Sequence, residues 1–389
     1  MEQAQRIPLV LLATGLSTAG SQMTLVAVPL LLVEHSHADR LPAAVAIELA
    51  VAGVGGLYIA RATSRLRAPA RLIVIDAVRC VFQLLLLLVD PKLDSIVSVP
   101  LLLTVVAVFA PAYAGGFRAV LAATVSGASD REAAAFGARA QLINRGAQLS
   151  GFAIAGVLVA IGVRSGLVLI DAVSYLFAAS IMWTATRSSR DSAGPLPQLI
   201  GFKRSMSLGH ALFPIAATEG VLQGLFVLLP LVLGRQHDGP WIFAGWMSAL
   251  AVGNALGVRF LSRKHLTPPT PRVLLLLIAG SYAASGIGHS PILQFVALTI
   301  IGVASAVYAA ITFACVSREL NPDDLGAAYA ASYVVTMLVG AATSAGIGLY
   351  PNTRDLFGLS VLLGLMIAAI GITTSSPDAT RAFVGPERG

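Results

Sequence analysis

Charged residues are scarce in this sequence. Of 389 residues, 12% are Asp, Glu, Lys or Arg, whereas soluble proteins carry about 25%. Only two cysteines occur, Cys80 and Cys315, and their distance in sequence gives no support to a disulfide framework or a metal site. The net charge of +7 is spread over short segments without a basic, aromatic-interleaved patch, which argues against nucleic-acid binding. No phosphate-binding motif GxxxxGK[ST] is present, so we do not expect ATP hydrolysis.

Apolar runs of membrane-spanning length fill the chain instead. Hydrophobic residues make up 56% of the sequence and the mean hydropathy is +0.82. A bilayer core needs about 20 apolar residues per helix. The runs lack the period-2 alternation of a membrane barrel, and only helices satisfy their own backbone in lipid. We expect an all-α membrane protein with spans at 7–33, 41–60, 71–89, 96–115, 137–162, 166–186, 207–233, 241–261, 271–288, 291–315, 325–349 and 355–374.

A polar segment near the midpoint, RSSRDSAGPLPQ, divides these twelve spans into two sets of six. Ser129-Asp-Arg-Glu132 precedes a Gly/Ala-rich fifth span, and Pro322-Asp-Asp-Leu325 precedes an equally Gly/Ala-rich eleventh. Such weak internal symmetry is typical of transporters built from two parallel repeats. We therefore expect two pseudo-symmetric six-helix bundles, a cytoplasmic linker and a cytoplasmic tail, at 1–186, 207–374, 187–206 and 375–389 respectively.

The positions of Lys and Arg indicate the orientation of the chain. With the N-terminus inside, 19 of the 26 basic residues fall in cytoplasmic segments and 5 on the opposite side, while Arg79 and Arg145 lie within spans. Cytoplasmic loops of membrane proteins are enriched in Lys and Arg. We therefore expect a multi-pass protein of the cell membrane with both termini in the cytoplasm.

Several loose motifs are shared with a known family. They are Asp76-Ala-Val-Arg79, Arg118-Ala-Val-Leu-Ala-Ala-Thr-Val125, Ala138-Arg-Ala-Gln-Leu-Ile-Asn-Arg145, Gly151-Phe-Ala-Ile-Ala-Gly156 and Leu169-Ile-Asp-Ala-Val-Ser-Tyr-Leu-Phe177. With these motifs the sequence resembles the major facilitator superfamily over nearly its whole length. Within that superfamily it looks most like the branch of the enterobactin exporter and the macrolide-efflux-type proteins. The resemblance implies a secondary transporter whose two halves rock about a central site.

The sequence departs from that family in three places. The loop between spans 2 and 3 usually reads GxxxDRxGRR; here Gly56, Arg61 and Arg65 match, but Ala60 replaces the acid and Thr63 replaces the second glycine. The fifth span lacks the proline of the Gly-Pro pair that many proton antiporters carry. The fourth span lacks a mid-helix arginine. In the family, the acid of the loop between spans 2 and 3 helps to hold one conformation through a charge contact with the other half, and its loss leaves that contact without support here. Proton coupling through the family's usual residues is likewise not supported.

Glu219 is the strongest candidate for chemistry within a span. It lies about 12 residues into the seventh span, roughly 18 Å deep and near the bilayer midplane. A charge at this depth costs about 2.5–3.5 kcal/mol on insertion scales, so it indicates function by default. Gln223 and Phe226 follow at i+4 and i+7 on the same face. We expect these three side chains to bind substrate or a proton, with a structural hydrogen bond to a neighbouring helix as the alternative for Glu219.

Other candidates for substrate or proton binding are Gln22, Tyr113, Tyr308 and Glu48. An amide such as that of Gln22 both donates and accepts hydrogen bonds. The resemblance implies that the spans of Tyr113 and Tyr308 line the central cavity, although packing is the commoner role of such rings. Glu48 and Arg145 carry opposite charges in neighbouring spans and could pair, in which case both are structural.

We expect a conformational gate at the cytoplasmic end of the third span. Asp76 and Arg79 are three residues apart on one helix face, which suits an ion pair. Our hypothesis joins this pair to Arg61 and Arg65 in one network, with Arg145 as a further structural charge. Asp171, near the outer end of the sixth span, is expected to be a helix-start or interface residue.

Together these features favour a proton-coupled exporter of a small amphipathic organic compound, such as a drug, siderophore or secondary metabolite. Uptake or passive diffusion of a small nutrient is the alternative within transport, and a non-transporting membrane sensor is the alternative outside it. A membrane enzyme would need clustered acids or histidines, which the sequence lacks. We expect a monomer in the lipid bilayer that takes a small-molecule substrate and protons, without cofactor, bound metal or nucleic acid.

The orientation is testable with topology reporters. Fusions at Ser192 and at the C-terminal Gly389 should be active only as cytoplasmic reporters, because the excess of basic residues keeps these segments inside. Periplasmic activity of either fusion would overturn the assignment.

Overall fold

The structure is a computed structural model. It describes residues 3–34, 41–90, 98–125, 130–186, 212–214, 216–221, 239–262, 270–287, 291–320 and 322–349. The expected twelfth span at 355–374, the linker at 187–206, the tail at 375–389 and most of the seventh span lie outside these residues.

The secondary structure of the described residues is helical. Five of the helical segments are long and apolar enough to cross a membrane by length and composition. They are 41–65, 68–89, 166–186, 292–313 and 324–348. The elements are α1 (Gln3–Glu34), α2 (Leu41–Ala62), η1 (Thr63–Arg65), α3 (Ala68–Val89), α4 (Ser98–Val108), α5 (Ala110–Val125), α6 (Asp130–Ala160), α7 (Arg164–Thr186), α10 (Gly239–Ser262), α11 (Pro271–Ile287), α12 (Pro291–Glu319) and α13 (Pro322–Gly348).

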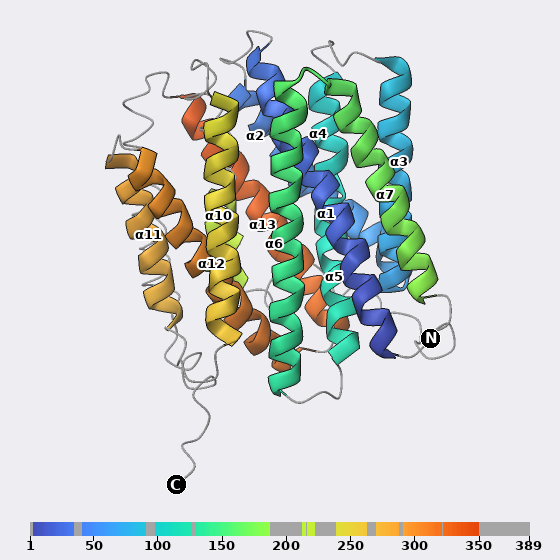
Figure 1. The fold of residues 1–389 in the computed structure, drawn as a ribbon. Coiled ribbons are helices and arrows are strands. Elements are labelled where there is room, and N and C mark those ends of the chain that lie inside the picture. The colour runs from blue at the N-terminus through green and yellow to red at the C-terminus, as the bar shows by residue number, and fades with distance from the viewer. Residues whose placement is uncertain are drawn as a thin grey trace.

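The helices form two groups that meet along shared seams (Figure 1). In the amino-terminal group, α1 packs against α6 and α7, and α3 packs against α7. In the carboxy-terminal group, α12 packs against both α10 and α11. The groups contact each other where α13 lies against α2 and α5, and where α6 lies against α10. Helices from both ends of the chain therefore surround the centre of the molecule.

The predicted fourth span, 96–115, is wrong as a single helix. Two helices, α4 and α5, replace it with a break at Phe109, and α5 continues to Val125. Pro111 has no N–H to donate to the carbonyl of Ala107, and such a lost bond kinks or breaks a helix. The sequence also placed the start of the fifth span at 137, whereas α6 begins at Asp130. The helix is longer than its apolar run because its polar amino-terminal end extends beyond the hydrocarbon core of the bilayer.

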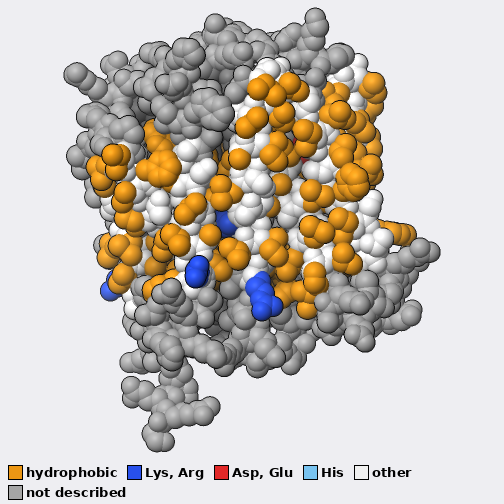
Figure 2. All heavy atoms as spheres, in the orientation of Figure 1, with side chains coloured by type: hydrophobic (Ala, Val, Ile, Leu, Met, Phe, Trp, Pro, Cys, Tyr) orange, Lys and Arg blue, Asp and Glu red, His pale blue; other side chains and the backbone are white. Residues whose placement is uncertain are grey.

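Hydrophobic side chains cover the face of the described region that Figure 2 shows. Large apolar side chains on α3 and α7 are exposed, among them Leu88, Val89, Leu176 and Phe177. Exposure of this apolar surface to water would cost a free energy of about 25 cal/mol per Å². In a bilayer the same surface faces lipid, as the amino-acid composition predicts.

Glycines let α10 and α12 approach at backbone distance. A Cβ atom at Gly302 would collide with the backbone carbonyl of Leu250, and one at Gly253 would collide with that of Thr299. Lipid provides no hydrophobic force between helices, so helix association in membranes depends on van der Waals packing. Small residues favour it because they let the two backbones approach closely. The close contact between α10 and α12 therefore requires glycine at these positions, because a side chain would collide with the backbone of the other helix.

Substitution of Gly302 by alanine should destabilise the protein. The added methyl group meets backbone, which cannot rotate away, and overpacking costs about 1–3 kcal/mol. Thermal unfolding in detergent, followed by tryptophan fluorescence, should show a lower midpoint for Gly302→Ala. Gly280→Ala is the matched control, because a Cβ there would meet nothing within 4 Å. An equal effect of both substitutions would contradict the packing argument.

Candidate functional site

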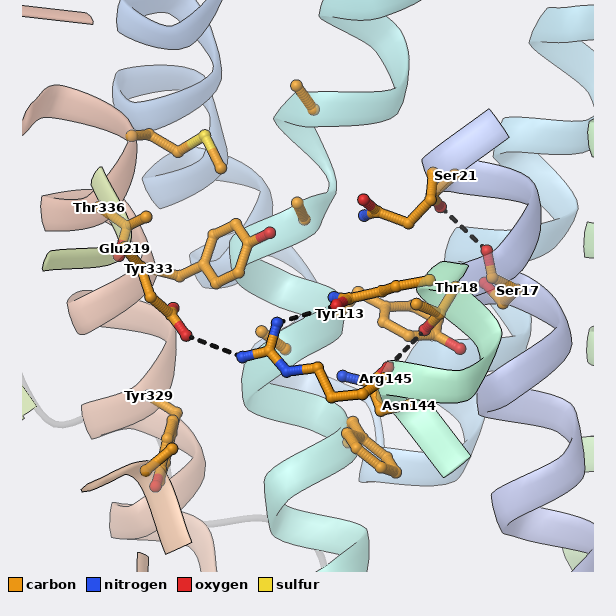
Figure 3. A pocket seen from close by; sticks show the side chains of 18 of the residues that line it. Ser17, Thr18, Ser21, Tyr113, Asn144, Arg145, Glu219, Tyr329, Tyr333 and Thr336 are labelled. Atoms are coloured by element: carbon orange, nitrogen blue, oxygen red, sulfur yellow. Dashed lines mark hydrogen bonds and ion pairs between the residues drawn. The ribbon is translucent and has the colours of Figure 1, made fainter. Parts of the chain in front are cut away.

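A cavity of about 270 Å³ lies at the centre of the molecule, between the two groups of helices. Residues of α1, α3, α5 and α6 line it from the amino-terminal group. Residues of α10, α12 and α13, together with Ala216 and Glu219, line it from the carboxy-terminal group. Figure 3 shows the polar side chains that point into it. A cavity shared by both groups is a candidate substrate site.

Arg145 of α6 and Glu219 face each other across this cavity (Figure 3). The Nη2 atom of Arg145 lies 3.4 Å from Oε1 of Glu219. The side chains keep 18% and 35% of their surface exposed, so a solute in the cavity can reach both. Nη1 of Arg145 donates to Oε1 of Gln148 at 2.8 Å, which orients the guanidinium. The ion pair links the two groups of helices and spares each charge from lying unpaired inside the bundle.

The backbone around Glu219 is held against α13. The hydroxyl of Thr336 donates to the carbonyl of Ala216 at 3.1 Å. A Cβ atom at Gly220 would lie 2.6 Å from the carbonyl oxygen of Thr336, so the two backbones are in close contact. Tyr329, Tyr333 and Thr336 follow at i, i+4 and i+7 on α13 and line the cavity. This side of the site therefore combines one carboxylate with aromatic rings and hydroxyls.

Hydroxyl and amide groups of α1 and α6 form the opposite wall. The hydroxyl of Thr18 donates to Oδ1 of Asn144 at 2.9 Å. Gln22 and Tyr113, which the sequence predicted as substrate contacts, both line the cavity. Neutral donors and acceptors of this kind bind hydroxyl, carbonyl or amine groups without the desolvation cost of a charge. The wall suits a polar organic solute.

Arg118 of α5 is surrounded by aromatic rings from both groups. Its guanidinium carbon lies 4.8 Å from the centre of the Tyr329 ring, 5.1 Å from that of Phe313 and 5.9 Å from that of Phe117. Phe313 belongs to α12 and Tyr329 to α13, so this cation–π contact crosses between the groups. Close by, α5 and α13 cross at Gly115 and Gly326, where a side chain at either would meet the other backbone. The cavity is therefore bounded towards the end of α5 by an Arg118 cage.

Asp76 and Arg79 lie deeper than the sequence predicted. They are 2% and 3% exposed, and their charged atoms are 4.0 Å apart. Ser17 donates to Oδ1 of Asp76 at 2.8 Å, and Nη2 of Arg79 donates to the carbonyl of Val106 at 2.9 Å. Arg79 also lines the cavity and lies over the ring of Tyr113. The pair belongs to the interior of the amino-terminal group.

The structure does not join the four predicted gate residues. Arg61 at the end of α2 and Arg65 in η1 are exposed, whereas Asp76 and Arg79 are buried. The buried hydroxyl of Ser17 and the carbonyl of Val106 draw the Asp76–Arg79 pair inward, away from the loop. The described contacts contain the predicted ion pair within α3 but no contact that joins it to Arg61 and Arg65, so the gate of four residues stays a prediction.

The remaining candidates are placed as follows. Glu48 is 3% exposed in α2 and does not line the cavity, and Arg145, which the sequence allowed as a partner of Glu48, pairs with Glu219 instead. Tyr308 is 5% exposed and packs in an apolar core of α12 rather than facing the cavity. Gln223 and Phe226 lie outside the described residues.

Sequence reasoning missed the roles of three residues. Arg145 was expected to be structural, and Arg118 was named only as part of a family motif. Asp171 was expected to be a helix-start or interface residue; α7 begins two turns earlier at Arg164, and Asp171 lies fully buried at the interface with α1 and α3. One signal was available: Arg145, Gln148 and Phe152 recur at i, i+3 and i+7, which places them on one stripe of α6.

Comparisons with known proteins agree with this architecture. The family model described as Major Facilitator Superfamily matches residues 10–345. No curated protein matches the chain. Among solved structures, a bacterial homologue of the iron transporter ferroportin in its outward-facing state is 15% identical, with a TM-score of 0.69 over 95% of this chain and 99% of that one. The E. coli fucose:proton symporter is 12% identical, with a TM-score of 0.61 over 95% and 99% of the two chains.

Loss of the Arg118 charge should loosen the cage. Cation–π contacts contribute about 0.5–2 kcal/mol, so Arg118→Gln should raise access to the cavity roughly twofold to thirtyfold. A cysteine at Ser332, which lines the cavity, reports this access in a background without Cys80 and Cys315. The rate of labelling by an impermeant thiol reagent, added from the side where α5 ends, is the measurement. Exposed Arg139 is the control for charge, and an equal rise in Arg139→Gln would contradict the role of the cage.

Proposed function

The chain belongs to the major facilitator superfamily, and on that premise we propose that it exports a small amphipathic organic compound through its central cavity. Members of this family are membrane transporters rather than enzymes. The Arg145–Glu219 ion pair is the observation that carries the proposal. It lies in the cavity, joins the two groups of helices and stays accessible to a solute.

The chemistry of the cavity indicates the class of substrate. About 270 Å³ lies just below the usual range for ligand pockets, roughly 300–1,000 Å³, which favours a small solute. Tyrosine rings of α13 can stack on an apolar part of the solute, while Thr18, Gln22 and Asn144 offer hydrogen bonds to a polar part. The iron and the fucose in the names of the similar structures are not carried over, because at these identities the likeness shows the fold alone.

Transport by this site requires the ion pair to open. A substrate between the two groups competes with Glu219 for Arg145, or with Arg145 for Glu219. Protonation of Glu219 releases Arg145 without leaving an uncompensated carboxylate inside the bundle, which would otherwise be costly. We therefore propose that a proton on Glu219 is exchanged for substrate as the seams between α13 and α2, and between α6 and α10, alternately open.

The direction and the topology complete the proposal. Export follows from the resemblance to the enterobactin-exporter and macrolide-efflux branch, with uptake or passive diffusion of a nutrient as its rival. Twelve spans in two six-helix halves, with both termini cytoplasmic in the cell membrane, accommodate the polar linker at 187–206. The protein works as a monomer in this proposal, since the cavity is built from one chain.

A sensitivity screen identifies the substrate. A strain without this protein should become sensitive to, and accumulate, one class of amphipathic compound from a panel of drugs, siderophores and metabolites. That compound then serves as the probe in proteoliposomes. Higher accumulation in the strain that contains the protein would instead indicate uptake.

In proteoliposomes, Glu219→Gln should abolish accumulation driven by a proton gradient and largely spare counterflow. Glutamine keeps the shape and hydrogen-bonding capacity but cannot bind and release the proton, whereas counterflow needs no net proton movement. We expect at least a tenfold loss of driven accumulation, in line with about 2.5–3.5 kcal/mol for a charge inside a membrane. Glu48→Gln is the comparator, because it removes a buried carboxylate outside the cavity. Wild-type accumulation by Glu219→Gln, with loss in Glu48→Gln, would move coupling to Glu48.

A further inference from the structure

A second carboxylate site lies behind the wall of the cavity, between α1, α3 and α7. Its centre is Asp171, which is fully buried. The hydroxyl of Thr24 donates to Oδ2 of Asp171. Nε2 of Gln83 donates to the same oxygen at 2.6 Å, and the hydroxyl of Tyr175 forms a further hydrogen bond with Asp171. All three partners are neutral side chains.

The charges of this region do not balance. Two carboxylates, Asp76 and Asp171, share a buried region with one guanidinium, that of Arg79. Arg79 is in ion-pair contact with Asp76, and its Nη2 donates a hydrogen bond to the backbone carbonyl of Val106. If both carboxylates are ionised, the region carries a net charge of −1 in a medium where an uncompensated charge is costly. One proton makes it neutral.

Two buried oxygen atoms without hydrogen-bond partners in the described part of the chain, one on Asp171 and one on Gln83, indicate where that proton binds. Oδ1 of Asp171 has no hydrogen-bond partner among the described residues, and neither has Oε1 of Gln83. Both side chains are fully buried, and Gln83 points at Asp171 through its amide. A proton on Asp171 would turn its free oxygen into a donor. Buried acceptors without donors are rare in folded proteins, so the arrangement favours the protonated acid.

Hydroxyl groups connect Asp171 to the cavity. Ser21 lines the cavity, and its Oγ lies 2.9 Å from the hydroxyl oxygen of Tyr175. Tyr175 in turn reaches Asp171. Each hydroxyl both donates and accepts, so a hydronium ion in the cavity can give its proton to Ser21 and become water, while the proton of Ser21 passes to Tyr175 and that of Tyr175 to Asp171. The carboxylate becomes the acid, and both hydroxyls are restored.

We propose that Asp171 is a proton-binding site of this protein, reached from the cavity through Ser21 and Tyr175. The titratable groups around it are Asp76, Arg79 and the Cys80 thiol on α3, together with Tyr175 on α7 itself. The described residues of α1 next to it, Ser21 and Thr24, contribute hydroxyls only. The inference rests on the proposed function only for the use of the proton, which would add to the one on Glu219.

Infrared difference spectroscopy tests the site without a substrate. The purified full-length protein in liposomes is compared between mildly acidic and mildly alkaline buffer. In a Glu219→Gln background, which removes the signal of the other proposed proton site, we expect the carbonyl stretch of a protonated carboxylic acid to vary with pH and to be lost when Asp171→Asn is added. Asparagine keeps the shape, and Gln83 can turn its free oxygen towards the new amide. Glu48→Gln is the comparator and should keep the band, because Glu48 lies on α2 and takes no part in this group of charges.

A kinetic measurement gives a second, independent test. Tyr175→Phe keeps the ring near Arg79 but removes the hydroxyl that links Ser21 to Asp171. After a pH jump, the band should appear at least about tenfold more slowly, because proton transfer by a positioned group contributes about 10²–10⁴-fold. Ser180→Ala removes an exposed hydroxyl of the same helix and should not change the rate.

The outcomes separate this inference from the transport proposal. A band that persists when Asp171→Asn is added, that is lost instead in Glu48→Gln, or that does not vary with pH in the Glu219→Gln background would overturn the assignment to Asp171. An unchanged rate in Tyr175→Phe would overturn the path. A protein that titrates at Asp171 but moves none of the compounds in the panel would contradict the proposed function and leave the proton site standing.

Discussion

A charge inside this bundle has to find its partner within the bundle, because hydrocarbon offers none. This constraint explains the positions of the interior arginines. Arg145 meets Glu219 across the cavity, Arg79 meets Asp76 beside it, and Arg118 lies among three aromatic rings. Two of these contacts join helices from opposite ends of the chain. The need to compensate charge and the need to hold the two groups together are therefore met by the same side chains.

The close helix seams follow from the same lack of a hydrophobic force between helices in lipid. Contacts between α5 and α13, and between α10 and α12, depend on glycines whose neighbours are backbone atoms. Such contacts are tight but contain little side-chain interdigitation. Two packed helices of this kind can separate without breaking a hydrogen-bonded network. The ion pair and the cation–π cage then account for much of the specific attraction across the seam between the groups.

Composition and hydropathy were enough to predict a helical membrane protein, since the length of an apolar run is set by bilayer thickness. Most helix positions followed for the same reason. The break at Phe109 was missed because Pro111 is itself compatible with an apolar run. The sequence identified Glu219 as a candidate for substrate or proton binding, but it did not predict that Arg145 faces it. The two residues are 74 positions apart and belong to different groups of helices, so no local spacing relates them. For Asp171 the sequence left a helix start and a helix interface open, because an acid near a span end is often a cap, and only three-dimensional packing shows it buried at the interface with α1 and α3.

The break between α4 and α5 has a mechanical consequence. Val106, in the last turn of α4, gives its carbonyl to the guanidinium of Arg79, so a side chain of α3 caps the broken helix. The same guanidinium is paired with Asp76. Any change in the angle between α4 and α5 must therefore displace Arg79 or lose its hydrogen bond. The break near Pro111 therefore couples the angle between α4 and α5 to the position of the buried Asp76–Arg79 pair.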